Sequence, residues 1–127
     1  MRPRSRTLTG QELEIMKIVW ELESATVRDV YQALLKRRRI AYTTVMTMMN
    51  ILEEKGYLRK KRLEERAYVY QASRPKNQVI KAMVRDFVDR VFNGSAERLL
   101  VHLVKDRRLS EKDLEQISRL IRESEGP

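Results

Sequence analysis

The 127-residue chain contains no cysteine, which excludes disulfides, thiolate nucleophiles and cysteine-based zinc sites. No apolar run approaches the ~20 residues of a membrane span, and MRPRSRTLTG lacks the apolar core of a signal peptide, so we expect a cytoplasmic protein. Histidine occurs once, as His102 in the apolar segment LLVHLV, where packing is commoner than catalysis or metal binding. Without a glycine-rich phosphate loop or a catalytic constellation, the sequence predicts no enzyme, no metal site and no cofactor.

What the chain has in excess is positive charge. It carries 27 Lys/Arg against 18 Asp/Glu, a net charge of +9. Such a balance favours an anionic partner: nucleic acid, a membrane surface or an acidic protein. Residues 1–74 hold 16 basic and 9 acidic residues, whereas residues 75–127 hold 11 and 9. We therefore expect two functional regions, 1–74 and 75–127, with the anionic partner at the first.

Three helices are predicted in the first region, over 10–22, 27–36 and 42–55. Thr9 with Glu12, and Thr26 with Asp29, form the capping-box pattern that opens the first two. In the third, an apolar face at i, i+3, i+4 and i+7 predicts the buried side. Gly56 follows as the residue that ends this helix.

The period then changes from helical to alternating. YLRKKRL and AYVYQAS predict a two-stranded antiparallel hairpin, roughly over 57–62 and 67–72, which Pro75 ends. Three helices followed by a hairpin, on a basic chain, indicate a mainly α fold with a small β-hairpin, the winged helix-turn-helix. In that fold the third helix enters the DNA major groove and the hairpin follows the phosphate backbone.

The outward face of the third helix carries the candidate base-reading residues. These are Thr43, Thr44, Thr47 and Asn50. Threonine can contact base edges or a thymine methyl, and asparagine can read adenine bidentately. The alternative is that Thr43 and Thr44 only satisfy backbone donors at a helix start. For the face as a group, the basic three-helix-and-hairpin pattern favours DNA.

The hairpin carries the candidate phosphate contacts: Arg59, Lys60, Lys61, Arg62 and Arg66. Cations so dense on a short ribbon fit a phosphate backbone. The alternative is a solvated edge strand that lysine protects from pairing. KRRR (36–39) has the same two interpretations, and the arginines near the N-terminus could reach a groove or a phosphate.

Helices are also predicted over 76–92, 96–105 and 111–124, with Ser110 and Asp113 capping the last. Their apolar stripes are Ile80, Met83, Val84, Phe87 and Val91, then Leu99, Leu100 and Leu103, then Leu114, Ile117 and Ile121. Three such short helices make a thin core alone, so a second copy of the chain is expected to cover these residues. The second region is therefore predicted to be a three-helix dimerisation domain of a homodimer.

Four segments in order carry a family resemblance over about residues 9–72: LTGQELEIMKIVWEL, ATVRDVYQAL, AYTTVMTMMNILEEKGYL and RAYVYQA. They resemble the BlaI/MecI penicillinase-repressor family, which includes CopY-type regulators. The resemblance implies a homodimeric winged-helix transcriptional repressor on a palindromic double-stranded DNA operator, upstream of β-lactamase or related stress genes. It also implies, as a partner, a membrane sensor-protease pathway that leads to repressor cleavage in the dimerisation region.

The chain departs from the family pattern at three places. Ile51-Leu52 stands where the family usually has Arg-Leu in the third helix, and Glu65-Arg66 stands where the hairpin turn often has Gly-Arg. His102-Leu103 replaces the scissile Asn-Phe pair, which argues against β-lactam-linked proteolysis. The absence of cysteine argues against the copper switch of CopY-type members.

Two other classes of function compete with a DNA-binding repressor. One is a protein-interaction adaptor that uses a winged helix without DNA, because a fold does not determine function. The other is an RNA-binding protein, which the small number of aromatic residues near the basic segments disfavours.

Overall fold

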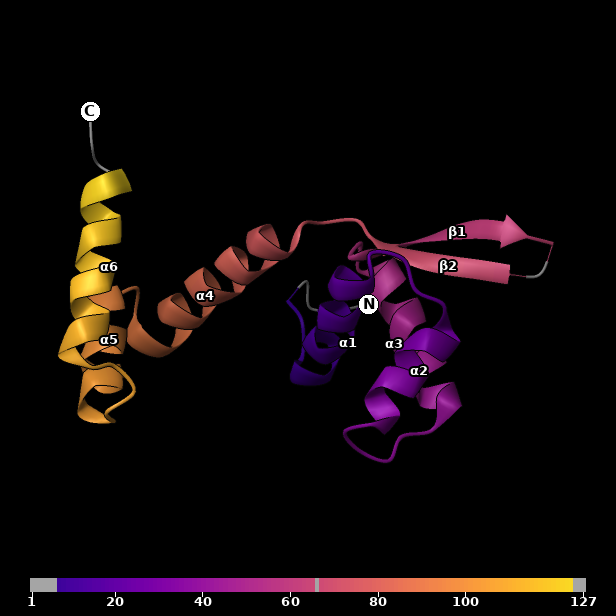
Figure 1. The fold of residues 1–127 in the computed structure, drawn as a ribbon, viewed down its shortest axis with the longest axis horizontal. Coiled ribbons are helices and arrows are strands. Elements are labelled where there is room, and N and C mark those ends of the chain that lie inside the picture. The colour runs from indigo at the N-terminus through magenta and orange to yellow at the C-terminus, as the bar shows by residue number, and fades with distance from the viewer. Residues whose placement is uncertain (1–6, 66, 125–127) are drawn as a thin grey trace. The chain divides into compact units, whose positions relative to one another are not determined.

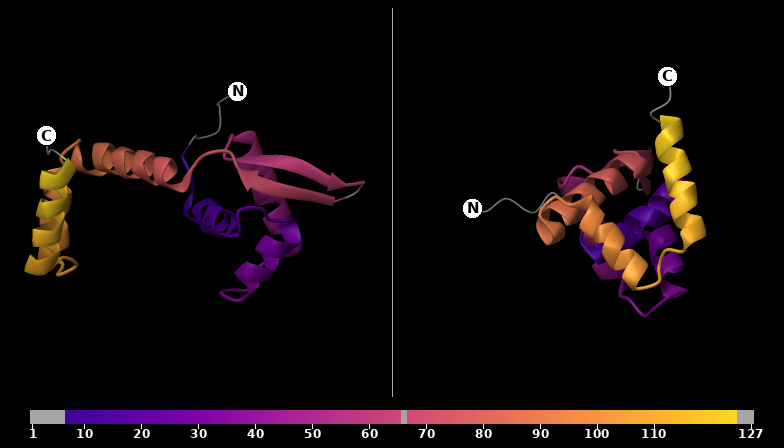
Figure 2. Two further views of the ribbon diagram at one scale, coloured as in Figure 1. Left: turned by 45° about the horizontal axis from the view of Figure 1, so that its top comes forward. Right: turned by 90° about the vertical axis from the view of Figure 1, so that its left-hand side faces the viewer.

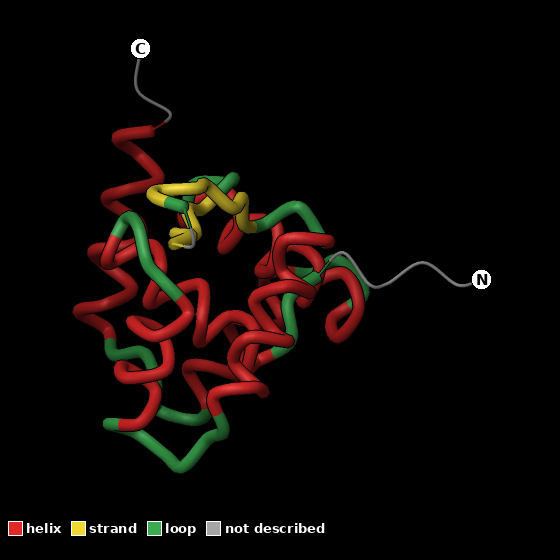
Figure 3. The backbone as a smooth tube through the Cα atoms, turned by 90° about the vertical axis from the view of Figure 1, so that its right-hand side faces the viewer, coloured by secondary structure: helices red, strands yellow, loops and turns green. Residues whose placement is uncertain are grey.

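The computed structural model describes residues 7–65 and 67–124. The regular elements of this part are α1 (Gly10–Leu22), α2 (Val27–Leu35), α3 (Tyr42–Glu54), β1 (Leu58–Glu64), β2 (Ala67–Ala72), α4 (Lys76–Phe92), α5 (Ala96–Lys105) and α6 (Glu111–Ser124) (Figure 1). Within the described ranges, strand structure is confined to the hairpin and the other regular elements are helices (Figure 3). The expected fold class, mainly helical with a winged helix followed by C-terminal helices, is confirmed, and each element lies close to its expected bounds.

Reciprocal capping boxes begin three of the helices. The Thr9 hydroxyl accepts from the Glu12 amide at 3.1 Å, and the Glu12 carboxylate accepts from the Thr9 amide at 2.9 Å. Thr26 and Asp29 repeat this at α2, and Ser110 and Asp113 at α6. Each N-cap bond typically stabilises its helix by about 1 kcal/mol. Because these bonds need specific residues three positions apart, the starts of these helices could be predicted from the sequence.

The chain forms two compact units that divide inside α4, one ending at Met83 and the other beginning at Val84. The expected boundary lay earlier, between residues 74 and 75. The first unit extends into α4 because Val79, only 3% exposed, belongs to its core cluster and Met83 packs against that cluster. The start of α4 is therefore part of the winged-helix unit.

The core of the winged-helix unit is fully closed. Its completely buried side chains come from all three of the first helices: Met16 and Val19 of α1, Val30 and Leu34 of α2, and Val45, Met49 and Leu52 of α3. Tyr57, Leu58 and Tyr70 cover one end of this cluster from the hairpin. Removing such side chains from water supplies roughly 1.5–3 kcal/mol each, so this core fixes how α3 and the hairpin lie against each other.

The hairpin is anchored at its base and irregular near its tip. Its antiparallel register pairs Leu58 with Ala72, Lys60 with Tyr70 and Arg62 with Tyr68, and it shifts between Arg62 and Glu64. On its other side, the Tyr70 backbone exchanges hydrogen bonds with Ala25, at N–O distances of 2.7 and 3.0 Å. The left view of Figure 2 shows the ribbon running out from the helices.

The second unit comprises the end of α4 with α5 and α6; the right view of Figure 2 shows the turn that joins the last two. Of its described residues, only Val88 is buried, at 8% exposure. Val84, Phe87 and Val91 of α4 are 43–55% exposed. His102, expected to be a packing residue, is exposed in the single chain, with its ring centroid 5.3 Å from that of Phe92. None of the described helices is long and apolar enough to cross a membrane.

Candidate nucleic-acid interface

Helix α3 has one buried face and one exposed face. Val45, Met49 and Leu52 are completely buried, and Met48 is partly buried, as the helical spacing predicted. The opposite face is exposed, and the residues predicted to read bases all lie on it: Thr43, Thr44, Thr47 and Asn50. Met46 joins them at 40% exposure. The helix therefore presents a polar face with a flexible thioether beside it.

The threonines of α3 do not cap the helix. Its N-cap residue is Ala41, and no side chain caps it. Within the described part of the chain, no hydrogen bond of the Thr43, Thr44 or Thr47 hydroxyl is seen. The alternative in which these threonines cap the start of α3 is therefore not what the structure shows, and their role as base contacts stays a prediction.

The cations of the hairpin divide between its two faces. Lys60 and Arg62 lie opposite Tyr70 and Tyr68 in the register, so they share the tyrosine face. Side chains alternate along a strand, which places Arg59 and Lys61 on the other face. All four are exposed, and Arg66 lies outside the described residues. The sequence predicts these cations as one group, and the register divides the four described ones between the two faces of the hairpin.

Two of these cations are engaged by the hairpin itself. The Lys60 ammonium lies 4.8 Å from the centroid of the Tyr68 ring and 5.7 Å from that of Tyr70. The Arg62 guanidinium donates to the Glu65 carbonyl at 2.6 Å and to the Glu64 carbonyl at 3.4 Å, which closes the glycine-free turn. Arg59 and Lys61 make no comparable contact to described residues, so they are the freer phosphate candidates.

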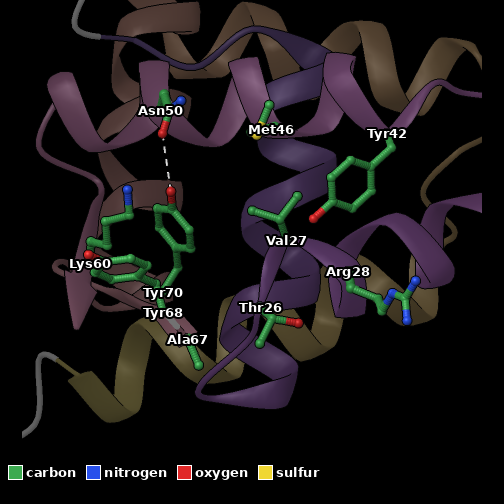
Figure 4. A pocket seen from close by; sticks show the side chains of 10 residues that line it. All are labelled: Thr26, Val27, Arg28, Tyr42, Met46, Asn50, Lys60, Ala67, Tyr68 and Tyr70. Atoms are coloured by element: carbon green, nitrogen blue, oxygen red, sulfur yellow. Dashed lines mark hydrogen bonds between the residues drawn. The ribbon is translucent and has the colours of Figure 1, made fainter. Parts of the chain in front are cut away.

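A hollow of about 430 Å³ lies between α3, the start of α2 and the tyrosine face of the hairpin (Figure 4). Its lining residues are Thr26, Val27, Arg28, Tyr42, Met46, Asn50, Lys60, Ala67, Tyr68 and Tyr70. Of the predicted site residues, the structure brings Asn50 and Lys60 together here. The three threonines do not line it.

At this hollow, the hairpin contacts the exposed face of α3. The Tyr70 hydroxyl donates to the Asn50 side-chain carbonyl at 3.1 Å, and Figure 4 shows the two side chains pointing toward one another. Tyr70 is only 2% exposed, whereas Asn50 is exposed. A buried anchor thus holds a side chain that faces outward.

Two residues of this hollow were missed from sequence. Arg28 is exposed in the first turn of α2, and Tyr42 opens α3 with its ring edge-on to Tyr31 at 5.4 Å. A cation in the first turn opposes the helix dipole, and this signal could have singled out Arg28. Of KRRR, Arg38 is bound to Glu14 at 2.9 Å, while the other three cations are exposed.

A buried ion pair fixes the far end of α3. The Lys55 ammonium lies 2.8 Å from the Glu12 carboxylate, and both side chains are 7% exposed. Burial raises the pKa of Glu12, but its bonds to Lys55 and Thr9 lower it by more, so the pKa lies below its ordinary value. The same Glu12 caps α1, so one carboxylate ties the start of α1 to the end of α3.

The described ranges hold no group of three or more His, Asp or Glu side chains placed to bind a metal ion. The site is instead a polar helix face beside a basic, tyrosine-backed ribbon. This arrangement has the charge and the extended shape that suit binding of a polyanion.

Comparison with known proteins gives consistent matches. A family model described as Penicillinase repressor matches residues 8–123. The penicillinase repressor of Bacillus licheniformis is 25% identical over 116 residues, covering 91% of this chain and 90% of that protein. The transcriptional regulator BlaI of Mycobacterium tuberculosis is 31% identical over 117 residues, covering 91% and 83%. A solved structure of the DNA-binding domain of the repressor BlaI matches with a TM-score of 0.51 at 28% identity, over 59% of this chain and 90% of that one.

Proposed function

Because the chain belongs to the penicillinase repressor family of transcriptional repressors, we propose that it binds a specific palindromic DNA operator as a homodimer in the cytoplasm. The family resemblance inferred from the sequence is confirmed by the match over residues 8–123. The family comprises repressors rather than enzymes, in agreement with the absence of a catalytic constellation in the sequence.

The observation that carries this proposal is the exposed face of α3 beside the basic hairpin. Three threonines whose hydroxyls are not used in capping stand there with Asn50, on a helix whose other face is locked into the core. A major groove admits such a helix and offers each base pair's pattern of donors and acceptors to it. Arg59 and Lys61 supply charge for the neighbouring phosphates.

The second unit supports the homodimer. Apolar side chains of α4 that would be buried in a closed core are exposed in one chain, Val84 at 50%, Phe87 at 43% and Val91 at 55%. Leu100 and Ile121 add to this surface at 37% and 51%. A second copy that covers these residues would complete the unit and bring two recognition helices onto one palindrome.

Selection of bound duplexes from a random pool, using the full chain, tests the proposal most directly. The expected result is a palindromic consensus with half-site centres about 10 base pairs apart, or a multiple of that spacing. Recovery of no consensus, with binding that ignores sequence, would overturn the repressor function. Weak binding to duplexes with no dependence on salt would instead favour a protein-interaction adaptor.

Sedimentation of the free protein tests the dimer separately. At micromolar concentration, far above a typical operator dissociation constant, the full chain should sediment as a dimer. A monomer at that concentration that still selects a palindrome would contradict the proposed role of the second unit, while leaving DNA recognition intact.

A further inference from the structure

We infer that Tyr70 is a positioning residue for base recognition: its hydroxyl holds the Asn50 carbonyl, so that Asn50 meets a base edge as a hydrogen-bond donor. This inference rests on the proposed function and specifies what one residue of the recognition helix reads. The juxtaposition behind it is a buried hydroxyl of the hairpin 3.1 Å from an exposed amide of α3.

Tyr70 is held from several sides, which makes it a fixed point. Its ring is buried, with 2% of the residue exposed, and belongs to the core cluster. Its backbone N–H and C=O both bond to Ala25, just before α2. The Lys60 ammonium lies 5.7 Å from its ring centroid. Its hydroxyl therefore has a definite position relative to α3.

Asn50 by itself has no such constraint. It is exposed on α3, and a free asparagine amide can present either its oxygen or its nitrogen to a partner. The bond from Tyr70 takes one of the two lone pairs of the oxygen and turns that oxygen toward the hairpin, and Figure 4 shows the amide nitrogen turned away from Tyr70. The side of the Asn50 amide that is turned away from the hairpin therefore carries its two N–H donors.

A donor selects differently from a bidentate amide. Reading adenine bidentately requires Asn50 to accept from the adenine amino group and donate to N7 at once. With its oxygen held by Tyr70, Asn50 instead donates to an acceptor: N7 or O6 of guanine, N7 of adenine or O4 of thymine. It disfavours cytosine, whose groove edge offers an amino donor. Asn50 would therefore distinguish bases by whether their groove edge accepts or donates a hydrogen bond.

The test begins by locating the base. Random-pool selections with the parent and with Asn50→Ala should give the same consensus except at one position in each half-site, where preference relaxes. At that position, a base analogue that lacks the acceptor should weaken binding roughly threefold to tenfold. An analogue that lacks only an exocyclic amino group should bind as the natural base does. Equal losses from both analogues would mean bidentate reading and overturn the inference.

Tyr70→Phe then tests the positioning role. It removes one hydroxyl and keeps the ring, and we expect it to relax preference at the Asn50 position only, with no further relaxation when combined with Asn50→Ala. Tyr31→Phe, which also removes one phenol hydroxyl from this unit, should leave the consensus unchanged. If the hydroxyl had only a structural role, its removal would weaken binding evenly across all sequences, and that outcome would overturn the inference.

Asn50→Asp provides a second route if Tyr70→Phe does not fold. Aspartate can still accept from Tyr70, but it offers the groove an acceptor in place of the amide donors. Overall affinity should fall because of the added negative charge, while the preferred base at that position should change to cytosine. An unchanged preference would contradict the inference. A parent protein that selects no consensus would instead refute the proposed function.

Discussion

The two units of the chain differ in what their apolar side chains contact. In the winged-helix unit, Met16, Val45 and Met49 are completely buried within one copy of the chain. In the second unit, Val88 is the one buried residue of the described part, and Val91 remains 55% exposed. The first unit therefore has a closed core of its own, and the second has the exposed apolar surface on which the proposed homodimer is based.

Because of this contrast, the stability of the fold and the association of two chains can be changed by different substitutions. Substitutions in the first core should change the free energy of unfolding, whereas substitutions on the exposed face of α4 should change association. The single tryptophan, Trp20, belongs to α1 and donates to the Arg74 carbonyl at 3.0 Å. Its fluorescence therefore reports on the first unit and provides a means of measuring the two effects separately.

The largest effect on folding is expected from Met49→Ala. It would leave a cavity in a closed core and lower the free energy of unfolding by about 3 kcal/mol. Met46→Ala, on the exposed face of the same helix, should change it by less than about 0.5 kcal/mol. Urea unfolding followed by Trp20 fluorescence measures both. Equal losses from the two substitutions would mean that α3 has no distinct buried face.

Lys55→Met should cost nearly as much at neutral pH, about 3 kcal/mol, because it leaves the Glu12 carboxylate buried without its partner. In the parent, the pKa of Glu12 lies below its ordinary 4.5, so its contribution to stability is present above that pH and is lost as the pH falls through the lower folded pKa. The deficit of the variant should therefore shrink in acid, where its lone carboxyl becomes protonated.

Unfolding curves of the parent and of Lys55→Met at pH 7 and pH 4 measure this change. Lys17→Met, at an exposed lysine of α1, is the matched control and should show little deficit at either pH. A deficit of Lys55→Met that stays constant with pH would contradict the role assigned to the Glu12 carboxylate.

Val91→Asp should act on the second unit alone. A charge in an apolar interface should weaken the dimer by about 2 kcal/mol, or roughly thirtyfold in its dissociation constant. The Trp20 transition should not move, because Val91 is exposed in the single chain. Arg85→Ala, at an exposed polar position of α4, is the control. Sedimentation across a concentration series measures the shift, and a displaced Trp20 transition would show that the units are not independent.

The smallest effect is expected from Lys61→Ala on the hairpin. Removal of one phosphate contact should weaken all duplexes evenly and lower the slope of log affinity against log salt by about one unit. Lys112→Ala in α6 should leave the slope unchanged. Binding isotherms at several salt concentrations measure it. An unchanged slope for Lys61→Ala would exclude this face of the hairpin from the backbone contact.

Local chemistry explains why the element bounds could be predicted. Thr9, Thr26 and Ser110 each stand three residues before an acidic partner, and the apolar spacing of α3 defines its inner face without tertiary information. The hairpin was predictable because alternation is a property of neighbouring residues. Such signals extend over only a few positions.

Contacts between distant residues could not be predicted in the same way. Glu12 appears in the sequence only as a capping residue, and its second partner lies 43 positions away. The bond between Asn50 and Tyr70 spans 20 positions and depends on the angle at which the hairpin leaves the core. Because Asn50 fits a groove-facing pattern by itself, nothing in its own segment indicates that the hairpin holds its oxygen.

The hairpin is bonded to the rest of the winged-helix unit at its base, and these contacts do not extend to its tip among the described residues. At the base, Tyr70 is bonded to Ala25 and the Ser73 amide to the Tyr57 carbonyl, so substitutions there would disturb the core. Near the tip, Leu63 is 63% exposed, and the turn is closed by the pairing of Glu64 with Ala67 and by the bonds that Arg62 donates to the carbonyls of Glu64 and Glu65. The tip can therefore vary in sequence and length at little cost to folding, so this end of the hairpin can change while the core stays the same.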